Sequence, residues 1–130
     1  DLEEAKNAAP GDSGIYLYLG MAYEATGDYN YAITNVYTAY LTQKDGTAEL
    51  YNQLGLCYLK QEQYAPALDA FQKAMQIPDN GMMQTLSFNE IVAYEYLGNY
   101  NQAAALLQNY LATYPDDETA KREYGFLSTR

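Results

Sequence analysis

The sequence contains no histidine, and so it lacks the side chain that most often serves as a general base or as a neutral metal ligand near pH 7. No serine or cysteine has an evident base beside it, and no phosphate-binding glycine loop precedes a helix. Cys57 is the single cysteine, which excludes a disulfide within the chain and a cysteine metal site. We therefore expect no enzyme activity, no cofactor and no metal, and we expect Cys57 to be a small buried hydrophobic residue.

Basic residues are scarce: 7 lysines and arginines stand against 17 aspartates and glutamates, for a net charge of −10. Nucleic acids and anionic membranes require clustered basic residues, and only Lys121 and Arg122 are adjacent here. No apolar run approaches the roughly 18 residues of a membrane span. The composition thus argues against a nucleic-acid partner and against membrane insertion of this region. It leaves the compartment open between the cytoplasm and an exported or cell-envelope location in a bacterium.

The chain does contain a motif that it repeats three times. Residues 19–23 (Leu-Gly-Met-Ala-Tyr) recur as residues 54–58 (Leu-Gly-Leu-Cys-Tyr) and, more loosely, as residues 91–94 (Ile-Val-Ala-Tyr). A tyrosine follows each copy, and these tyrosines lie 35 and 36 residues apart. They are Tyr29, Tyr64 and Tyr100. A fixed period of this length indicates a solenoid, in which each unit buries its apolar face against its neighbours.

Within each copy the apolar residues recur three or four positions apart, which is the spacing of helices rather than strands. Gly27 and Asp28 separate the two halves of the first copy. Glycine there can end one helix in the left-handed conformation, and aspartate can cap the start of the next. Gly98 and Asn99 repeat this chemistry in the third copy, whereas the second copy has residues 62–63 (Glu-Gln). Each period therefore predicts two antiparallel helices joined by a tight turn.

Small residues occupy positions at which these helices must approach each other. Gly20 and Gly55 lie inside predicted helices, where a glycine costs roughly 1 kcal/mol relative to alanine. Close packing of an aromatic ring against the helix backbone would compensate for that cost. We expect the facing rings to be Tyr23, Tyr58 and Tyr94, each three residues beyond the small residue or its equivalent.

The repeated pattern resembles that of the tetratricopeptide repeat (TPR) family. That family combines a Leu-Gly pair, a tyrosine three residues on, a Gly-Asp-Tyr turn, then alanine, an aromatic residue, alanine and a late proline. The second copy matches with Phe71 and Ala74, the first has Val36 at the aromatic position, and the third keeps the turn, Ala103 and Pro115. The resemblance covers nearly the whole chain. It implies an all-α fold, a right-handed α-solenoid of antiparallel helix pairs forming a TPR-like superhelix.

The resemblance divides the chain into the parts of a single solenoid. The expected parts are the end of a preceding repeat at residues 1–10, repeats at residues 13–46, 48–80 and 84–115, and a capping helix or the start of a further repeat at residues 116–130. Pro115 followed by three acidic residues predicts the start of that last helix. Because the chain begins inside a repeat and without an initiator methionine, we expect it to be a piece of a longer protein.

In a solenoid of this kind the first helix of each pair lines the inner groove of the superhelix. The residues of those helices that face away from the packing stripe are the candidates for contact with a peptide. They are Leu17, Met21, Glu24, Asn52, Leu56, Leu59, Phe88, Val92, Glu95, Tyr96 and Arg122, with Phe126 as a further member. We expect Asn52 to bond to the backbone of a ligand, and Glu24 and Glu95 to favour a basic side chain.

Family members that bind chaperone tails hold a terminal carboxylate with lysines, an arginine and asparagines on these faces. The matching places here are Leu17, Met21, Asn52 or Gln53, Thr85 and Asn89. Because the lysines and the arginine are missing from this set, we expect no capture of an acidic C-terminal peptide.

The resemblance implies a scaffold or adaptor that binds a protein, as a peptide or a helix, in a concave, largely apolar and mildly acidic groove. One alternative is a structural spacer or self-association module of a larger protein, a homo-oligomer through its terminal helices. In another, the groove is filled by a neighbouring part of the full-length protein or by a second copy.

Overall fold

The computed structural model of the chain describes Glu4 and residues 12–129, and every regular element within them is helical. In chain order the elements are α2 (Ser13–Ala25), α3 (Tyr29–Tyr31), η1 (Ala32–Tyr37), α4 (Thr38–Leu41), α5 (Ala48–Lys60), α6 (Tyr64–Met75), α7 (Met83–Tyr96), α8 (Tyr100–Thr113) and α9 (Glu118–Leu127). Apart from Glu4, the expected end of a preceding repeat at residues 1–10 lies outside the described residues. Among the described helices, none has both the length and the apolar composition that crossing a bilayer requires.

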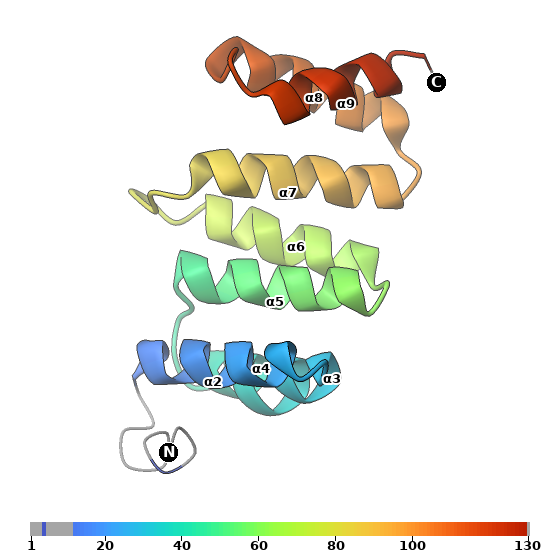
Figure 1. Ribbon diagram of the computed structural model, residues 1–130. Helices are drawn as coiled ribbons and strands as arrows, with labels where there is room; N and C mark the ends of the chain where they lie inside the picture. Colours follow the sequence, from blue (N-terminus) through green and yellow to red (C-terminus); the bar gives the residue numbers. More distant parts are fainter. Residues whose placement is uncertain (1–3, 5–11, 130) are drawn as a thin grey trace.

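The helices stack one upon another in the order of the chain (Figure 1). α2 pairs with the continuous helix formed by α3, η1 and α4, α5 pairs with α6, and α7 pairs with α8, while α9 packs on α8. Successive pairs are joined by contacts of α5 with α2 and η1, and of α6 with α7. The chain is therefore an all-α solenoid, as the sequence predicts, and α2 and α9 lie at its two ends (Figure 1).

The tight turns inside the helix pairs follow the predicted chemistry. Gly27 and Gly98 adopt left-handed backbone angles, with φ of 83° and 80°. Asp28 and Asn99 follow them, and each side chain accepts a hydrogen bond from the backbone amide three residues on, at 3.2 and 3.3 Å. In the second pair Glu62 adopts the same left-handed region with φ of 59°, at a cost of roughly 1 kcal/mol for a residue with a side chain.

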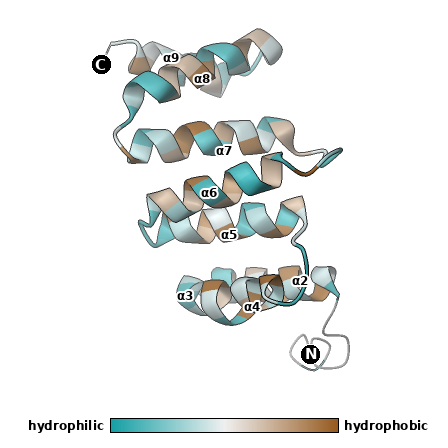
Figure 2. Cartoon of the chain, turned by 180° about the vertical axis from the view of Figure 1, so that it is seen from behind, coloured by the Kyte–Doolittle hydropathy of each residue, from teal (hydrophilic) through white to brown (hydrophobic). Residues whose placement is uncertain are grey.

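The buried residues form three clusters in a row rather than one central core. The first lies among α2, η1, α4, α5 and α6, the second among α5, α6 and α7, and the third among α7, α8 and α9. Tyr37, Phe71 and Leu107 occupy matching places in these clusters and are fully buried. Hydrophobic and hydrophilic residues are interspersed along the helices (Figure 2), which is typical of helices that bury one face and expose another.

Two glycines allow paired helices to approach closely. A Cβ atom on Gly20 would lie 2.2 Å from Cζ of Tyr37, and one on Gly55 would lie 2.5 Å from Cε1 of Phe71. The facing rings thus come from the second helix of the same pair. The prediction of Tyr23, Tyr58 and Tyr94 as those rings was wrong. Tyr23 and Tyr58 lie on the same helix as the glycine, three residues on, whereas the space that each glycine leaves is filled from the partner helix.

The π-helix η1 brings Tyr37 to its position against Gly20. Tyr37 follows Gly20 by 17 residues, whereas Phe71 follows Gly55 by 16. A π-helical turn closes its hydrogen bond over one residue more than an α-helical turn does. The extra residue shifts the aromatic side chain of the first pair one place along the chain, from the expected Val36 to Tyr37. Val36 is fully buried beside it.

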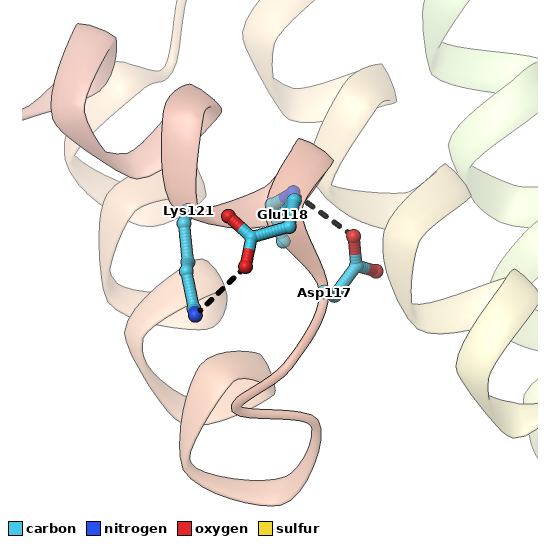
Figure 3. A network of polar contacts seen from close by, with 4 residues as sticks. Asp117, Glu118 and Lys121 are labelled. Atoms are coloured by element: carbon cyan, nitrogen blue, oxygen red, sulfur yellow. Dashed lines mark hydrogen bonds and ion pairs between the residues drawn. The ribbon is translucent and has the colours of Figure 1, made fainter.

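The last helix begins where the acidic run predicts it. Asp117 is the N-cap of α9, and its Oδ1 accepts a hydrogen bond from the backbone amide of Ala120 at 3.1 Å (Figure 3). The hydroxyl of Tyr110 donates to Oδ2 of the same side chain at 2.5 Å, and this bond lowers the pKa of Asp117. The ion pair of Lys121 with Glu118, at 3.2 Å, is exposed and adds little stability (Figure 3).

Candidate functional site

An open groove of about 480 Å³ crosses α2, α5 and α7, the first helices of the three pairs. It extends toward the C-terminal ends of these helices, because their last residues, Ala25, Lys60 and Tyr96, all line it. The full lining is Met21, Glu24, Ala25, Tyr29, Gln53, Leu56, Leu59, Lys60, Val92 and Tyr96. The groove therefore lies on the face of the solenoid at which the sequence predicts contact with a ligand.

The structure brings six of the predicted site residues together in this groove. They are Met21, Glu24, Leu56, Leu59, Val92 and Tyr96. The other four, Ala25, Tyr29, Gln53 and Lys60, were not among the predicted contacts, although Gln53 was named with Asn52 as an inner-face position. The helical spacing already contained a signal for three of them. Ala25 lies four residues after Met21, and Gln53 and Lys60 lie three before and four after Leu56, on the same helix faces.

Two apolar residues that were predicted to contact a ligand, Leu17 and Phe88, pack against core clusters. Leu17 is partly buried against the first core cluster. Phe88 packs against the third cluster, where its ring lies 5.8 Å from that of Tyr110 in an edge-on arrangement. Neither side chain is part of the groove lining, and both help to pack the helices, so their contact with a ligand stays a prediction. Both are near the N-terminal halves of their helices, away from the groove.

The predicted role of Asn52 is corrected, because its side chain is buried and forms a hydrogen bond within the protein. Only 5% of the residue is exposed, and its Oδ1 accepts a hydrogen bond from Nδ2 of Asn89 at 2.8 Å. A buried polar side chain requires such a partner. The bond joins α5 to α7, so Asn52 links two neighbouring repeats and its oxygen is not offered to a ligand backbone.

The remaining predicted residues lie beside the groove or away from it. Glu95 is partly buried at the penultimate position of α7 and is not part of the lining. Arg122 and Phe126 are exposed on α9, which does not contribute to this groove. The groove thus takes its acidic character from Glu24.

Glu24 is the penultimate residue of α2, and two neutral groups act on its carboxylate. The hydroxyl of Tyr37 donates to Oε2 at 2.5 Å, and the thiol of Cys57 interacts with the same carboxylate. Partial burial raises the pKa of Glu24, and these two interactions oppose that rise. Burial also raises the pKa values of the Tyr37 hydroxyl and the Cys57 thiol, so both remain protonated donors.

Cys57 is fully buried, which confirms its prediction as a small buried side chain. Its interaction with Glu24 is one that the sequence did not indicate. In the part of the chain that the structure describes, no group of three or more acidic or cysteine side chains is placed to hold a metal ion.

Aromatic and aliphatic side chains form the rest of the groove surface. Met21 is 42% exposed and Tyr96 is 59% exposed, which is unusual for side chains of this size. The ring of Tyr96 stacks on that of Tyr64 with centroids 4.8 Å apart and an angle of 9°, and this contact fixes its orientation. Lys60 supplies the basic side chain of the lining and, among the described residues, forms no ion pair.

Two sequence models of one family, described as Tetratricopeptide repeat, match the chain. One covers residues 12–80 and the other covers residues 88–117. No curated protein sequence matches the chain. The two matched ranges together contain all of the groove lining.

Solved structures with the same arrangement of helices have little sequence in common with the chain. The second TPR domain of human RPAP3, in complex with the HSP70 peptide SGPTIEEVD, has a TM-score of 0.75 at 22% identity over 88% of this chain and 93% of its own. The Arabidopsis OM64 TPR domain has a TM-score of 0.77 at 24% identity over 91% and 95%. A crystal structure of MamA has a TM-score of 0.84 at 21% identity over 97% and 72%. At these identities the similarity shows the fold.

Proposed function

Because the chain belongs to the tetratricopeptide repeat family, we propose that it is a protein-interaction scaffold whose groove across α2, α5 and α7 binds a peptide or a helix of another protein. Proteins of this family are in general interaction modules rather than enzymes. The observation that carries the proposal is the convergence of side chains from three successive repeats on one open, mostly apolar groove. Concave surfaces of this kind are what solenoids use for binding.

The shape and chemistry of the groove suit a segment rather than a small molecule. Met21, Leu56 and Val92 come from three different helices and give an apolar surface that is open on one side. An amphipathic helix or an extended chain can lay its apolar side chains on such a surface. Gln53 adds an amide that can bond to the backbone of the segment.

The RPAP3 domain was solved with a peptide that ends in acidic residues. The groove described here has the carboxylate of Glu24 and a single lysine, Lys60. An acidic tail would meet a like charge at Glu24. We therefore propose that the segment bound here is not an acidic C-terminal tail.

Panning of a phage library of random twelve-residue peptides against the domain tests the groove. We expect the selected peptides to bind the Met21→Ser/Val92→Ser double variant at least tenfold more weakly, a loss of about 1.4 kcal/mol. Neither residue belongs to a core cluster, so the variant should remain folded. The matched control is Met83→Ser, since Met83 is 43% exposed and lies outside this groove. Peptides that bind the double variant as well as the native domain would place the binding surface elsewhere.

A second candidate function, self-association through the terminal helices, is supported by one observation. Phe126 is 50% exposed on α9, the helix at the C-terminal end of the stack. An exposed apolar side chain on the last described helix of a solenoid suits contact with a second copy. Sedimentation at micromolar concentrations tests this candidate. A concentration-dependent oligomer that Phe126→Ser abolishes would support it, and a monomer throughout would exclude it.

A further inference from the structure

The groove lies where three helices end. α2, α5 and α7 each place their last residue in its lining. The C-terminal end of a helix carries a partial negative charge of roughly half an elementary charge, which favours a cation nearby. Neither α2 nor α7 has a basic residue in its last turn, whereas α5 has Lys60. The helix backbones alone therefore give this end of the groove a negative electrostatic potential.

Glu24 adds an acidic side chain at this electronegative place. An acidic side chain in the last turn of a helix is unfavourable for the helix itself, because it faces the negative end of the dipole. Burial makes the carboxylate harder still to ionise, and raises its pKa. The first repeat thus places an anion where folding alone does not favour one.

The two groups that interact with Glu24 neither neutralise its charge nor occupy all of its hydrogen-bond acceptor positions. The Tyr37 hydroxyl and the Cys57 thiol are neutral donors, and a carboxylate has about four acceptor positions. No ion pair with Glu24 is present among the described residues. Because Glu24 lines the groove, a cationic group that enters the groove can reach the carboxylate.

We propose, on the basis of the groove function above, that the bound segment carries a lysine or arginine whose cationic group pairs with the Glu24 carboxylate, while neighbouring apolar side chains of the segment lie on Met21, Leu56 and Val92. The aliphatic stem of such a residue is itself suited to an apolar surface. The exposed ring of Tyr96, held flat by Tyr64, offers a face for the same cation.

Tyr37 acts in this arrangement as a positioning residue. Its place depends on the extra residue of η1, and its hydroxyl fixes the Glu24 carboxylate from the side of the second helix. Phe71 and Leu107, at the matching places in the second and third pairs, have no hydroxyl, so this arrangement is specific to the first of the three described pairs. The net charge of −10 adds a long-range attraction for a basic segment.

The peptides obtained by panning test the inference directly, with affinities measured by fluorescence polarisation. We expect the native domain to select peptides with one lysine or arginine at a fixed position among apolar residues. Replacing that residue by glutamine should weaken binding about tenfold or more, and Glu24→Gln should weaken the original peptide by a similar factor. The two changes combined should add little to either alone, because they remove the same contact.

Two variants serve as controls for charge. Asp45→Asn removes one negative charge from an exposed loop position outside the groove, and should leave the affinity within about twofold. Lys60→Gln removes the competing cation of the groove and should strengthen binding of the basic peptides. Tyr37→Phe should reduce the preference for the basic peptide over its glutamine version, and should leave the affinity for the glutamine version unchanged.

The outcomes separate this inference from the groove function on which it rests. Peptides without a basic residue, or an unchanged preference in Glu24→Gln, would overturn the inference alone, provided that Met21→Ser/Val92→Ser still loses binding. Peptides that bind this double variant normally, or no selected peptide at all, would overturn both.

Discussion

The ring of Tyr37 lies against the backbone of Gly20 so closely that a Cβ atom there would be 2.2 Å from the ring carbon Cζ. The same relationship joins Phe71 to Gly55 in the second pair. In both pairs the glycine removes a side chain so that an aromatic ring of the partner helix can occupy its space. In the first pair this close packing also affects the groove, because the ring that lies on Gly20 carries the hydroxyl that donates to Glu24.

Gly20→Ala should destabilise the domain. The added methyl group would overlap the buried ring of Tyr37, and overpacking of this kind costs about 1–3 kcal/mol, which exceeds the gain of roughly 1 kcal/mol in helix propensity. Urea denaturation measures the change. Gly125→Ala is the matched control, because Gly125 lies in α9 with no atom within 4 Å of its Cβ position. That variant should gain up to about 1 kcal/mol, and a loss equal to that of Gly20→Ala would refute the explanation.

Tyr37→Phe should lower the free energy of unfolding by about 1–3 kcal/mol, because it leaves the partly buried Glu24 carboxylate with one donor fewer. The substitution keeps the ring on Gly20, so packing is preserved. Tyr18→Phe provides the comparison, since Tyr18 is 64% exposed and should change stability by less than about 0.5 kcal/mol. Equal effects of the two variants would show that the Tyr37 hydroxyl contributes nothing.

The stability that Glu24 contributes should fall as the pH rises. Burial raises the pKa of Glu24 above its ordinary value of 4.5, so the folded state holds this proton more tightly than the unfolded state. The contribution is then fully present below the unfolded pKa and is lost as the pH rises through the folded pKa. We expect the free energy of unfolding of the native domain, minus that of Glu24→Gln, to decrease as the pH rises above about 4.5.

Urea denaturation of both proteins at a series of pH values checks this sign. Asp117 has the opposite behaviour, because its hydrogen bond from Tyr110 lowers its pKa, and its contribution is lost as the pH falls. Since Asp117 is present in both proteins, its effect cancels in the subtraction. If the difference in free energy of unfolding between the native domain and Glu24→Gln grew with pH, the hydrogen-bonding groups around Glu24 would affect its pKa more than burial does.

Asn89→Ala should destabilise the domain by about 1–3 kcal/mol, because it leaves the buried oxygen of Asn52 without its donor. The double variant Asn52→Leu/Asn89→Leu should lose less than Asn89→Ala, since it removes both polar partners together. Thermal unfolding of the single and double variants measures the coupling between α5 and α7. A double variant that loses as much stability as Asn89→Ala, or more, would show that the unpaired oxygen of Asn52 is not the cause of the loss.

The Cys57 thiol should resist modification in the folded domain. It is fully buried and its pKa is raised by burial, so little thiolate is available to react. Ellman's reagent should titrate one thiol promptly in denaturant and far more slowly in its absence. Rapid reaction of the native domain would show that the second helix pair opens easily around α5.

The period of the motif and the turn residues predicted the fold, because both depend on local chemistry. Gly27 and Gly98 take the left-handed angles that their positions require, and Asp117 caps the last helix. The first pair differs from the prediction for another reason: Tyr37, and not Val36, occupies the aromatic position. The one-residue difference in spacing between Gly20 and Tyr37, compared with Gly55 and Phe71, is visible in the sequence, but its meaning depends on where the helix takes up the extra residue.

The site was predicted less completely than the fold. Helical periodicity identifies the inner face, and it placed Met21, Leu56 and Val92 on one surface. It does not show which residues of that face are covered by the neighbouring repeat. Asn52 is covered because its partner, Asn89, lies 37 residues later in the chain, and a contact of that range depends on how the repeats are stacked.

Because the three core clusters lie in a row, we expect the domain to unfold in parts. Opening the last helix exposes only the third cluster, while the first, around Tyr37, keeps all of its partners. Protection of backbone amides against hydrogen exchange should therefore be graded along the stack, lowest in α9 and higher in α5 and α6, which have neighbours on both sides. Pulled from its ends, the domain should yield in steps, one helix pair at a time.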